Sequence, residues 1–191
     1  MSTAAPEKLM TVEEFLALPD DDGVERMLIC GRLWEKPMTR RNRWHSSTEA
    51  RIAQLLANWV DAQPQPRGEV YSGEAGFLLR RNPDSTVVID VAYVSAETAS
   101  RQTEETTLID GIPVLAVEIL SPSDKQNEIA AKVDDYLSVG VPLVWVVDPH
   151  FQTVLVHRPD HRPELFYGDD QLIGDPHLPG FHVKAADIFA R

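Results

Sequence analysis

The chain has little cysteine, no long apolar run and no recognisable export signal. Its single cysteine, Cys30, has no partner for an intramolecular disulfide and supplies no cysteine cluster for a metal. This is typical of a protein in a reducing compartment. No window of about 18 consecutive apolar residues occurs, and the N-terminus, MSTAAPEKLMTVEEF, lacks a basic start, an apolar stretch and a small-residue cleavage site. These absences predict a soluble cytoplasmic protein with no membrane association.

Basic residues are also scarce: 18 Lys and Arg stand against 30 Asp and Glu, which gives a net charge of -12 at pH 7. Such a charge repels nucleic acid at long range and argues against tight non-specific binding to DNA. The candidates for a patch that contacts phosphates are Arg40, Arg41, Arg43, Arg80 and Arg81. Arginines scattered over an acidic surface are usually only solvated, so both interpretations stay open.

Several catalytic motifs are missing. The sequence has no GxSxG elbow, no phosphate-binding GxxxxGK[ST] and no GxGxxG at the start of a predicted helix. Acyl transfer and nucleotide binding therefore lack the residues that they require. His157 and His161 have the spacing of a helical metal pair, but Pro159 between them disfavours a regular helix, so we exclude this pair as a metal site.

The length and the apolar content indicate one domain. The chain has 191 residues, of which 43% are hydrophobic, enough for a sizeable core. We expect residues 1–10 to form a flexible tail and residues 11–191 a single domain. Thr11 and Glu14 have the spacing of a helix capping box. The remaining predicted elements are a hairpin over 25–37, helices over 42–62 and 124–139, strands over 69–80, 86–94, 113–120, 142–148 and 153–158, and a terminal helical turn in AADIFAR.

The order of these elements predicts an α/β fold. Strand 113–120, helix 124–139 and strand 142–148 form a unit that normally makes a right-handed crossover between parallel strands. Ser123 is the expected N-cap of this helix and Gly140 its C-terminal stop. The sequence therefore predicts a mixed β-sheet flanked by helices, with an N-terminal β-hairpin at the rim.

Two acidic residues lie inside apolar strands: Asp90 in VVIDVAYV and Glu118 in VLAVEIL. A buried carboxylate is costly unless it has a cation, a hydrogen-bond partner or a raised pKa. One shared metal ion would satisfy both residues. The alternative is that each is a structural buried acid, or lies at a strand end and points to solvent.

Two helices carry further polar groups that can face the sheet. At about 100° per residue, Lys132 falls on the edge of the apolar stripe of its helix, so its amine can reach the sheet. Lys132 also has Glu128 one turn before it, a pairing that is usually solvated. On the first long helix Glu49 lies on the apolar stripe, with His45 one turn earlier. The alternative is that both are boundary residues, since a polar residue at the edge of an apolar stripe often lies only between the core and the solvent.

An aspartate and a glutamate on neighbouring strands, with a lysine near both, suit divalent-metal hydrolysis of phosphodiesters. Carboxylate oxygens bind Mg²⁺, which lowers the pKa of a bound water, and a lysine orients that water or offsets charge in the transition state. We therefore expect Asp90, Glu118 and Lys132 to be catalytic, with Mg²⁺ as cofactor and Mn²⁺ as a substitute. Hydrolysis of a glycoside by paired carboxylates is a further alternative, but it has no use for Lys132. Tyr136 is predicted to be a core aromatic residue whose hydroxyl finds a partner.

Four segments carry a resemblance to a known family. They are IDVAYV around Asp90, EILSPSD at 118–124, the pair Lys132 and Tyr136, and GVPLVWVVDP at 140–149. Together they resemble the Uma-two family of predicted endonucleases, a bacterial branch of the PD-(D/E)XK nuclease superfamily. The segment ERMLICGRLWEKP is similar to the family's N-terminal hairpin, so the resemblance spans nearly the whole chain.

The resemblance implies a restriction endonuclease-like fold, a DNA substrate and a homodimer. It also implies that Asp90 and Glu118 are metal ligands, that the carbonyl of Ile119 is a further ligand, and that Glu49 matches an additional acidic residue on the first core helix. The superfamily's lysine two residues after the glutamate is Leu120 here, and the resemblance places that lysine at Lys132.

The sequence departs from the family at Ile89, where proline usually precedes the aspartate. A literal Pro-Asp pair occurs at Pro83 and Asp84, but it lies in a turn signal, so Asp90 is the better match. The altered motif and the acidic charge keep a second hypothesis open. In that hypothesis the fold is a catalytically vestigial binding or assembly module.

Overall fold

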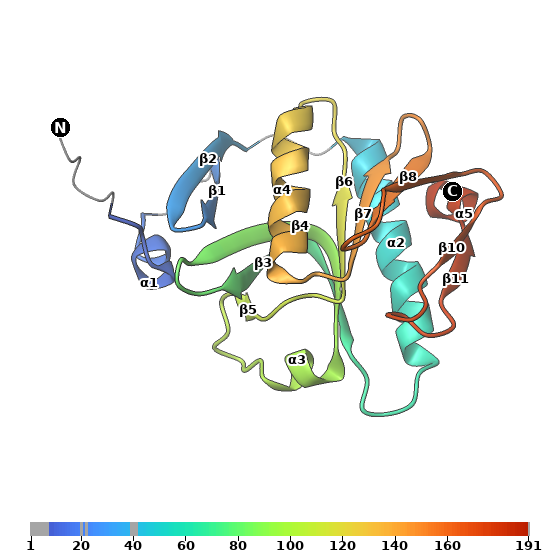
Figure 1. The fold of residues 1–191 in the computed structure, drawn as a ribbon, viewed down its shortest axis with the longest axis horizontal. Helices are drawn as coiled ribbons and strands as arrows, with labels where there is room; N and C mark the ends of the chain where they lie inside the picture. Colours follow the sequence, from blue (N-terminus) through green and yellow to red (C-terminus); the bar gives the residue numbers. More distant parts are fainter. Residues whose placement is uncertain (1–7, 20, 22, 39–41, 191) are drawn as a thin grey trace.

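The computed structural model describes residues 8–19, 21, 23–38 and 42–190, and these form a mixed α/β structure. Its main sheet has nine strands in the order β2-β1-β4-β6-β7-β8-β9, with β3 paired to β4 and β5 paired to β3. Helix α4 crosses one face of the sheet and α2 lies on the other (Figure 1). The predicted mixed sheet flanked by helices, with its N-terminal hairpin, is confirmed.

The helices and strands have the following bounds. The helices are α1 Val12–Leu16, α2 Arg43–Asp61, α3 Ala96–Ser100, α4 Gln126–Val139 and α5 Ala185–Phe189. The strands are β1 Val24–Ile29, β2 Arg32–Pro37, β3 Glu69–Arg80, β4 Ser85–Val94, β5 Ile109–Asp110, β6 Leu115–Ile119, β7 Leu143–Asp148, β8 Thr153–His157, β9 Glu164–Tyr167, β10 Gln171–Ile173 and β11 His182–Lys184. Strands β10 and β11 pair with each other as a separate small sheet.

The strand, helix, strand unit predicted from the sequence is β6-α4-β7, and β6 and β7 are parallel. Gly140 ends α4 with a left-handed φ of 97°, a conformation that glycine adopts without steric cost. The predicted N-cap is wrong, because α4 begins at Gln126 and its N-cap is Lys125. The Asp124 carboxylate instead accepts the N–H of Ser121 at 2.7 Å, which closes a turn before the helix starts.

The N-terminal segment and helix α2 begin with well-defined caps. The predicted capping box of Thr11 and Glu14 is present at the start of α1. Asn42 caps α2 by accepting the N–H groups of Trp44 and His45. Most of the predicted tail, residues 1–7, lies outside the described residues, and within the described part Met10 N–H donates to the carbonyl of Gly31 at 2.8 Å.

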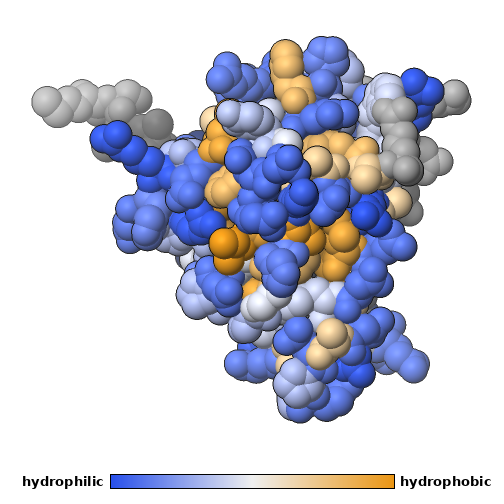
Figure 2. Space-filling model, turned by 90° about the vertical axis from the view of Figure 1, so that its right-hand side faces the viewer, coloured by the Kyte–Doolittle hydropathy of each residue, from blue (hydrophilic) through white to orange (hydrophobic). Residues whose placement is uncertain are grey.

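Two apolar cores lie on opposite faces of the sheet, because alternate residues of each strand point to opposite sides. One core contains Trp145 of β7 and packs against α2 and α5. The other contains Phe77 of β3 and packs against α4. Figure 2 shows the side of the molecule that carries α5, where polar residues cover most of the surface and apolar residues gather near its middle. Among the described residues, no helix has both the length and the apolar character needed to cross a membrane.

Replacement of phenylalanine by alanine should separate the core from the surface. Phe77 is fully buried, whereas Phe151 is 73% exposed. We expect Phe77→Ala to lower the free energy of unfolding by about 3–5 kcal/mol through lost burial and a cavity, and Phe151→Ala to change it by less than about 0.5 kcal/mol. Urea unfolding followed by circular dichroism measures both. Equal losses in the two variants would contradict this description of the core.

Candidate active site

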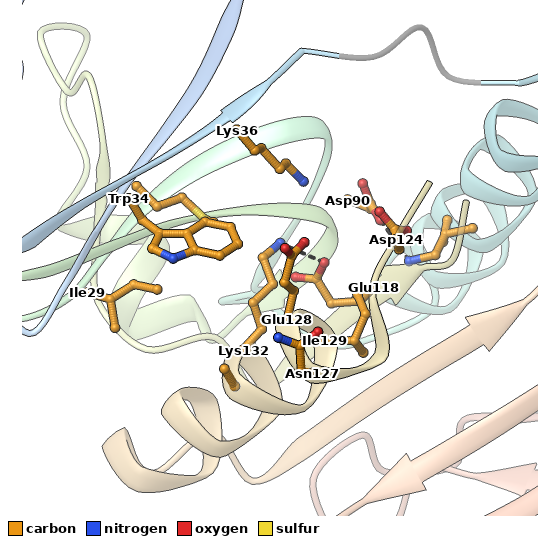
Figure 3. Close-up of a pocket in the computed structure, with 13 residues that line it drawn as sticks. Ile29, Trp34, Lys36, Asp90, Glu118, Asp124, Asn127, Glu128, Ile129 and Lys132 are labelled. Atoms are coloured by element: carbon orange, nitrogen blue, oxygen red, sulfur yellow. Dashed lines mark hydrogen bonds and ion pairs between the residues drawn. The ribbon is translucent and has the colours of Figure 1, made fainter. Parts of the chain in front are cut away.

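The pairing of β4 with β6 brings the two in-strand acids together. The antiparallel register that joins Val91 to Val117 puts Asp90 and Glu118 at neighbouring positions of adjacent strands. Both side chains are nearly buried, with 5% of Asp90 and 4% of Glu118 exposed. The two residues also line one cavity of about 200 Å³ (Figure 3). The structure therefore brings the two acids together in one cavity, and their role as shared metal ligands stays a prediction.

Helix α4 supplies two hydrogen-bond donors to Glu118. Lys132 Nζ lies 2.8 Å from Glu118 Oε2, and it also donates to the carbonyl of Val88 on β4 at 3.2 Å. The Tyr136 hydroxyl donates to Glu118 Oε1. Lys132 and Tyr136 are four residues apart on α4, so they lie on one side of the helix. Since both partners are donors, Glu118 accepts at both oxygens, as an ionised carboxylate does.

The environment shifts the pKa of each member of this group. Burial raises the pKa of Glu118, and the charge of Lys132 opposes that shift. Burial acts to lower the pKa of Lys132, but the charge and the hydrogen bond of Glu118 outweigh burial and raise this pKa above its usual value. The pKa of Tyr136 is well above its usual value, chiefly because of burial. Lys132 is therefore an ammonium near neutral pH and Tyr136 keeps its proton.

Asp90 has a different set of partners. Its Oδ2 accepts the N–H of Ile119 at 2.7 Å and lies 3.3 Å from Nε2 of His45. Burial acts to raise the pKa of Asp90, but the contacts with His45 and Ile119 outweigh burial and hold this pKa below its usual value. Asp90 is therefore ionised at neutral pH.

His45 links Asp90 to Glu49. The His45 side chain is completely buried, and its Nδ1 lies 3.7 Å from Glu49 Oε2. The other oxygen of Glu49 accepts the N–H of Gly73 at 2.6 Å. Within the described part of the chain, neither ring nitrogen of His45 makes a hydrogen bond of good geometry, so each faces a carboxylate at a longer distance. Glu49 lies behind Asp90 and is not among the residues that line the cavity.

The N-terminal hairpin forms one wall of the cavity. Trp34 and Lys36 of β2 line it opposite Glu118 and Lys132, as Figure 3 shows. Lys36 Nζ lies 3.2 Å from the Glu25 carboxylate of the neighbouring strand. From the sequence this hairpin is predicted at the rim of the domain, and neither Trp34 nor Lys36 is among the predicted site residues. The run RLWEKP places an aromatic residue and a cation two positions apart on one strand, and this pattern could have indicated that the hairpin contributes to the site.

The carboxylates of the cavity meet some of the requirements of a site for a hard divalent cation. Among the residues that the structure describes, no three His, Cys, Asp or Glu side chains are grouped so that they could hold a metal ion. Mg²⁺, however, is commonly held by one or two carboxylates and retains several waters. Asp90 and Glu118 meet that requirement, because a hydrogen-bonded carboxylate oxygen keeps a second lone pair. Ligation by Glu49 and by the Ile119 carbonyl stays a prediction.

Asp84, which was rejected in favour of Asp90, and the described candidates for phosphate contact do not line the cavity. Asp84 accepts the N–H groups of Val12 and Asn82, so it stabilises a turn. Arg81 pairs with Glu13 at 3.0 Å, and Arg80 lies 3.6 Å from Asp135. Arg40 and Arg41 lie outside the described residues. Contact between any of these arginines and DNA stays a prediction.

Comparisons with known proteins agree with this fold. A model of the Uma2 family, described as "Putative restriction endonuclease", matches residues 12–186. The chain also resembles a crystal structure described as "a putative nuclease belonging to DUF820" from Anabaena variabilis, with a TM-score of 0.76 and 24% sequence identity over 94% of this chain and 97% of that one. No curated protein is similar enough to this chain to match it. The structural likeness, at this identity, shows the fold alone.

The hydrogen bond from Tyr136 to Glu118 should stabilise the protein more than a similar bond at the surface. Tyr71 donates to the exposed carboxylate of Glu69, so Tyr71→Phe is a matched control. We expect Tyr136→Phe to lower the free energy of unfolding by about 2 kcal/mol, because a buried charged acceptor loses its donor, and Tyr71→Phe to lower it by less than about 1 kcal/mol. Urea unfolding at pH 7 measures the difference. If the two losses were the same, Glu118 would not depend on Tyr136.

Proposed function

The chain belongs to the Uma2 family, described as "Putative restriction endonuclease", and we propose that it hydrolyses phosphodiester bonds of DNA with a divalent metal ion. One observation carries the proposal. Lys132 reaches from α4 to within 2.8 Å of Glu118, beside Asp90 on the adjacent strand, in a single cavity. This combination of two strand carboxylates and a helix-borne ammonium suits phosphodiester hydrolysis.

The proposed mechanism assigns the metal to Asp90 and Glu118. When bound, Mg²⁺ would supply a Lewis acid and would lower the pKa of a bound water. Lys132 is an ammonium that orients this water by hydrogen bonding and offsets the negative charge that develops on the phosphate oxygens. Contact with Glu118 outweighs burial and raises the pKa of Lys132, which favours this charged form. Tyr136 and Lys132 together fix the orientation of Glu118.

His45 and Ile119 have the corresponding role for Asp90. The Ile119 N–H and the buried imidazole restrain one carboxylate oxygen of Asp90. A restrained ligand loses little conformational entropy when it binds an ion, which favours a site that is ready before the substrate arrives. His45 in turn lies 3.7 Å from Glu49, so Glu49 can help to hold the imidazole that restrains Asp90.

The net charge of -12 constrains how the substrate binds. Local cations, namely Lys132, Lys36 and the bound metal, have to offset the repulsion between the acidic chain and the phosphates. We further propose that Mn²⁺ substitutes for Mg²⁺, that the protein acts in the cytoplasm and that it forms a homodimer. A homodimer would carry two such sites related by symmetry, which suits cleavage of two DNA strands.

Cleavage of supercoiled plasmid at low salt tests the proposed reaction. We expect nicking in Mg²⁺ or Mn²⁺ that EDTA abolishes, and a rate about 100-fold lower in Glu118→Gln because the metal loses a charged ligand. Glu164→Gln is the matched control, since Glu164 lies on β9 and pairs with Arg158 at the surface.

The control variant should cleave as the wild type does. Nicking that survives EDTA, or equal rates in Glu118→Gln and the wild type, would contradict the metal mechanism. Folded wild-type protein that cleaves no DNA form with any of these ions would favour the second hypothesis, a binding or assembly module with a vestigial site.

A further inference from the structure

One aromatic side chain is strongly exposed at the surface. Phe151, in the turn between β7 and β8, is 73% exposed, the highest value among the large apolar side chains of the described residues. The turn that holds it is well defined: Asp148 Oδ1 accepts the N–H groups of His150 at 2.8 Å and Phe151 at 3.0 Å. Gln152 then has a left-handed φ of 54°. The exposure of Phe151 is thus a property of a structured turn.

A second exposed aromatic ring lies across a groove from Phe151. Trp44, in the first turn of α2, is 37% exposed. The guanidinium of Arg43 lies 4.3 Å from the centre of the Trp44 ring. Trp44 and Phe151 line the same groove of about 550 Å³, together with His150 and Leu120. Two aromatic rings, one of them beside a cation, therefore share an open groove.

Both walls of this groove adjoin groups that contact Asp90. Leu120 follows Ile119, whose N–H donates to Asp90. Trp44 precedes His45, whose ring lies 3.3 Å from Asp90. Along the chain, the groove residues Leu120 and Trp44 are thus each next to a residue that contacts Asp90. Among the described residues the groove and the catalytic cavity have no lining residue in common, but Leu120 of the groove directly follows Ile119 of the cavity at the end of β6.

We propose that Trp44 and Phe151 form a stacking site for an unpaired base of the substrate, so that the protein acts on single-stranded or locally unpaired DNA. This inference rests on the proposed nuclease function. Bases in a duplex are stacked on one another, and only an unpaired base offers its face to a protein aromatic ring. Stacking also gives affinity without a basic surface, which suits a chain with a net charge of -12.

Binding of a labelled oligonucleotide tests the stacking site. Fluorescence anisotropy at low salt in EDTA, where metal-dependent cleavage cannot occur, compares one sequence as a single strand and as a blunt duplex. The variants are Trp44→Leu and Phe151→Leu, which remove a ring but keep an apolar side chain. The control is Tyr167→Leu, because Tyr167 is 61% exposed on the edge strand β9, away from the groove.

We expect the wild type to prefer the single strand. Each groove variant should bind the single strand about tenfold more weakly, the usual size of one base-aromatic contact, and the control should bind as the wild type does. Unchanged single-strand binding in both groove variants, or a wild type that prefers the duplex, would overturn the stacking site. A change from dimer to monomer in Phe151→Leu, seen by sedimentation, would also overturn it, since the groove would then be a contact between two copies.

The plasmid assay separates this inference from the proposed reaction. If cleavage depends on Glu118 while the groove variants bind single strands normally, the stacking site is wrong and the nuclease function stands. If the groove variants lose single-strand binding while no plasmid is cut, the stacking site stands and hydrolysis fails.

Discussion

The ion pair between Lys132 and Glu118 is the interaction on which the site depends. Both side chains are largely removed from solvent, with 11% of Lys132 and 5% of Glu118 exposed, so water replaces either partner only poorly. Breaking a buried pair typically costs about 3–5 kcal/mol, because one charge is left without compensation. Lys132 also binds the carbonyl of Val88, so the pair joins α4 to both β4 and β6. The same contacts of Lys132 therefore hold α4 in its orientation over the sheet and hold Glu118 in its position.

The same pair explains why Glu118 can occupy a strand that is otherwise apolar. Its two oxygens have donors from a single helix turn, and those donors also restrict its rotation. Asp90 is restrained in an equivalent way by Ile119 and His45. The protein thus keeps two buried acids at neighbouring positions. Burial of a carboxylate costs free energy, and apolar residues at the same strand positions would avoid that cost. This cost is the strongest physical reason to assign the two acids a chemical role.

The sequence predicted those parts of the fold that local patterns determine. Strand 69–80 was predicted with its observed bounds, and Gly140 was recognised as the end of α4. The position of Lys132 on the edge of a stripe was enough to predict its approach to the sheet. By contrast, β10 and β11 have three residues each and pair only with each other, so no periodicity marks them. The contact of His45 with Asp90 and the position of Trp34 in the cavity wall depend on contacts between distant segments, which a linear pattern does not contain.

Binding of Mn²⁺, followed by its electron paramagnetic resonance signal, tests most directly whether Asp90 and Glu118 hold one metal ion together. The wild type, Asp90→Asn and Glu118→Gln would be compared at neutral pH, each checked for folding by circular dichroism. The present account predicts one bound ion in the wild type and at least a tenfold loss of affinity in each variant, about 1.4 kcal/mol or more. Wild-type affinity in both folded variants, or no bound ion in the wild type, would contradict it.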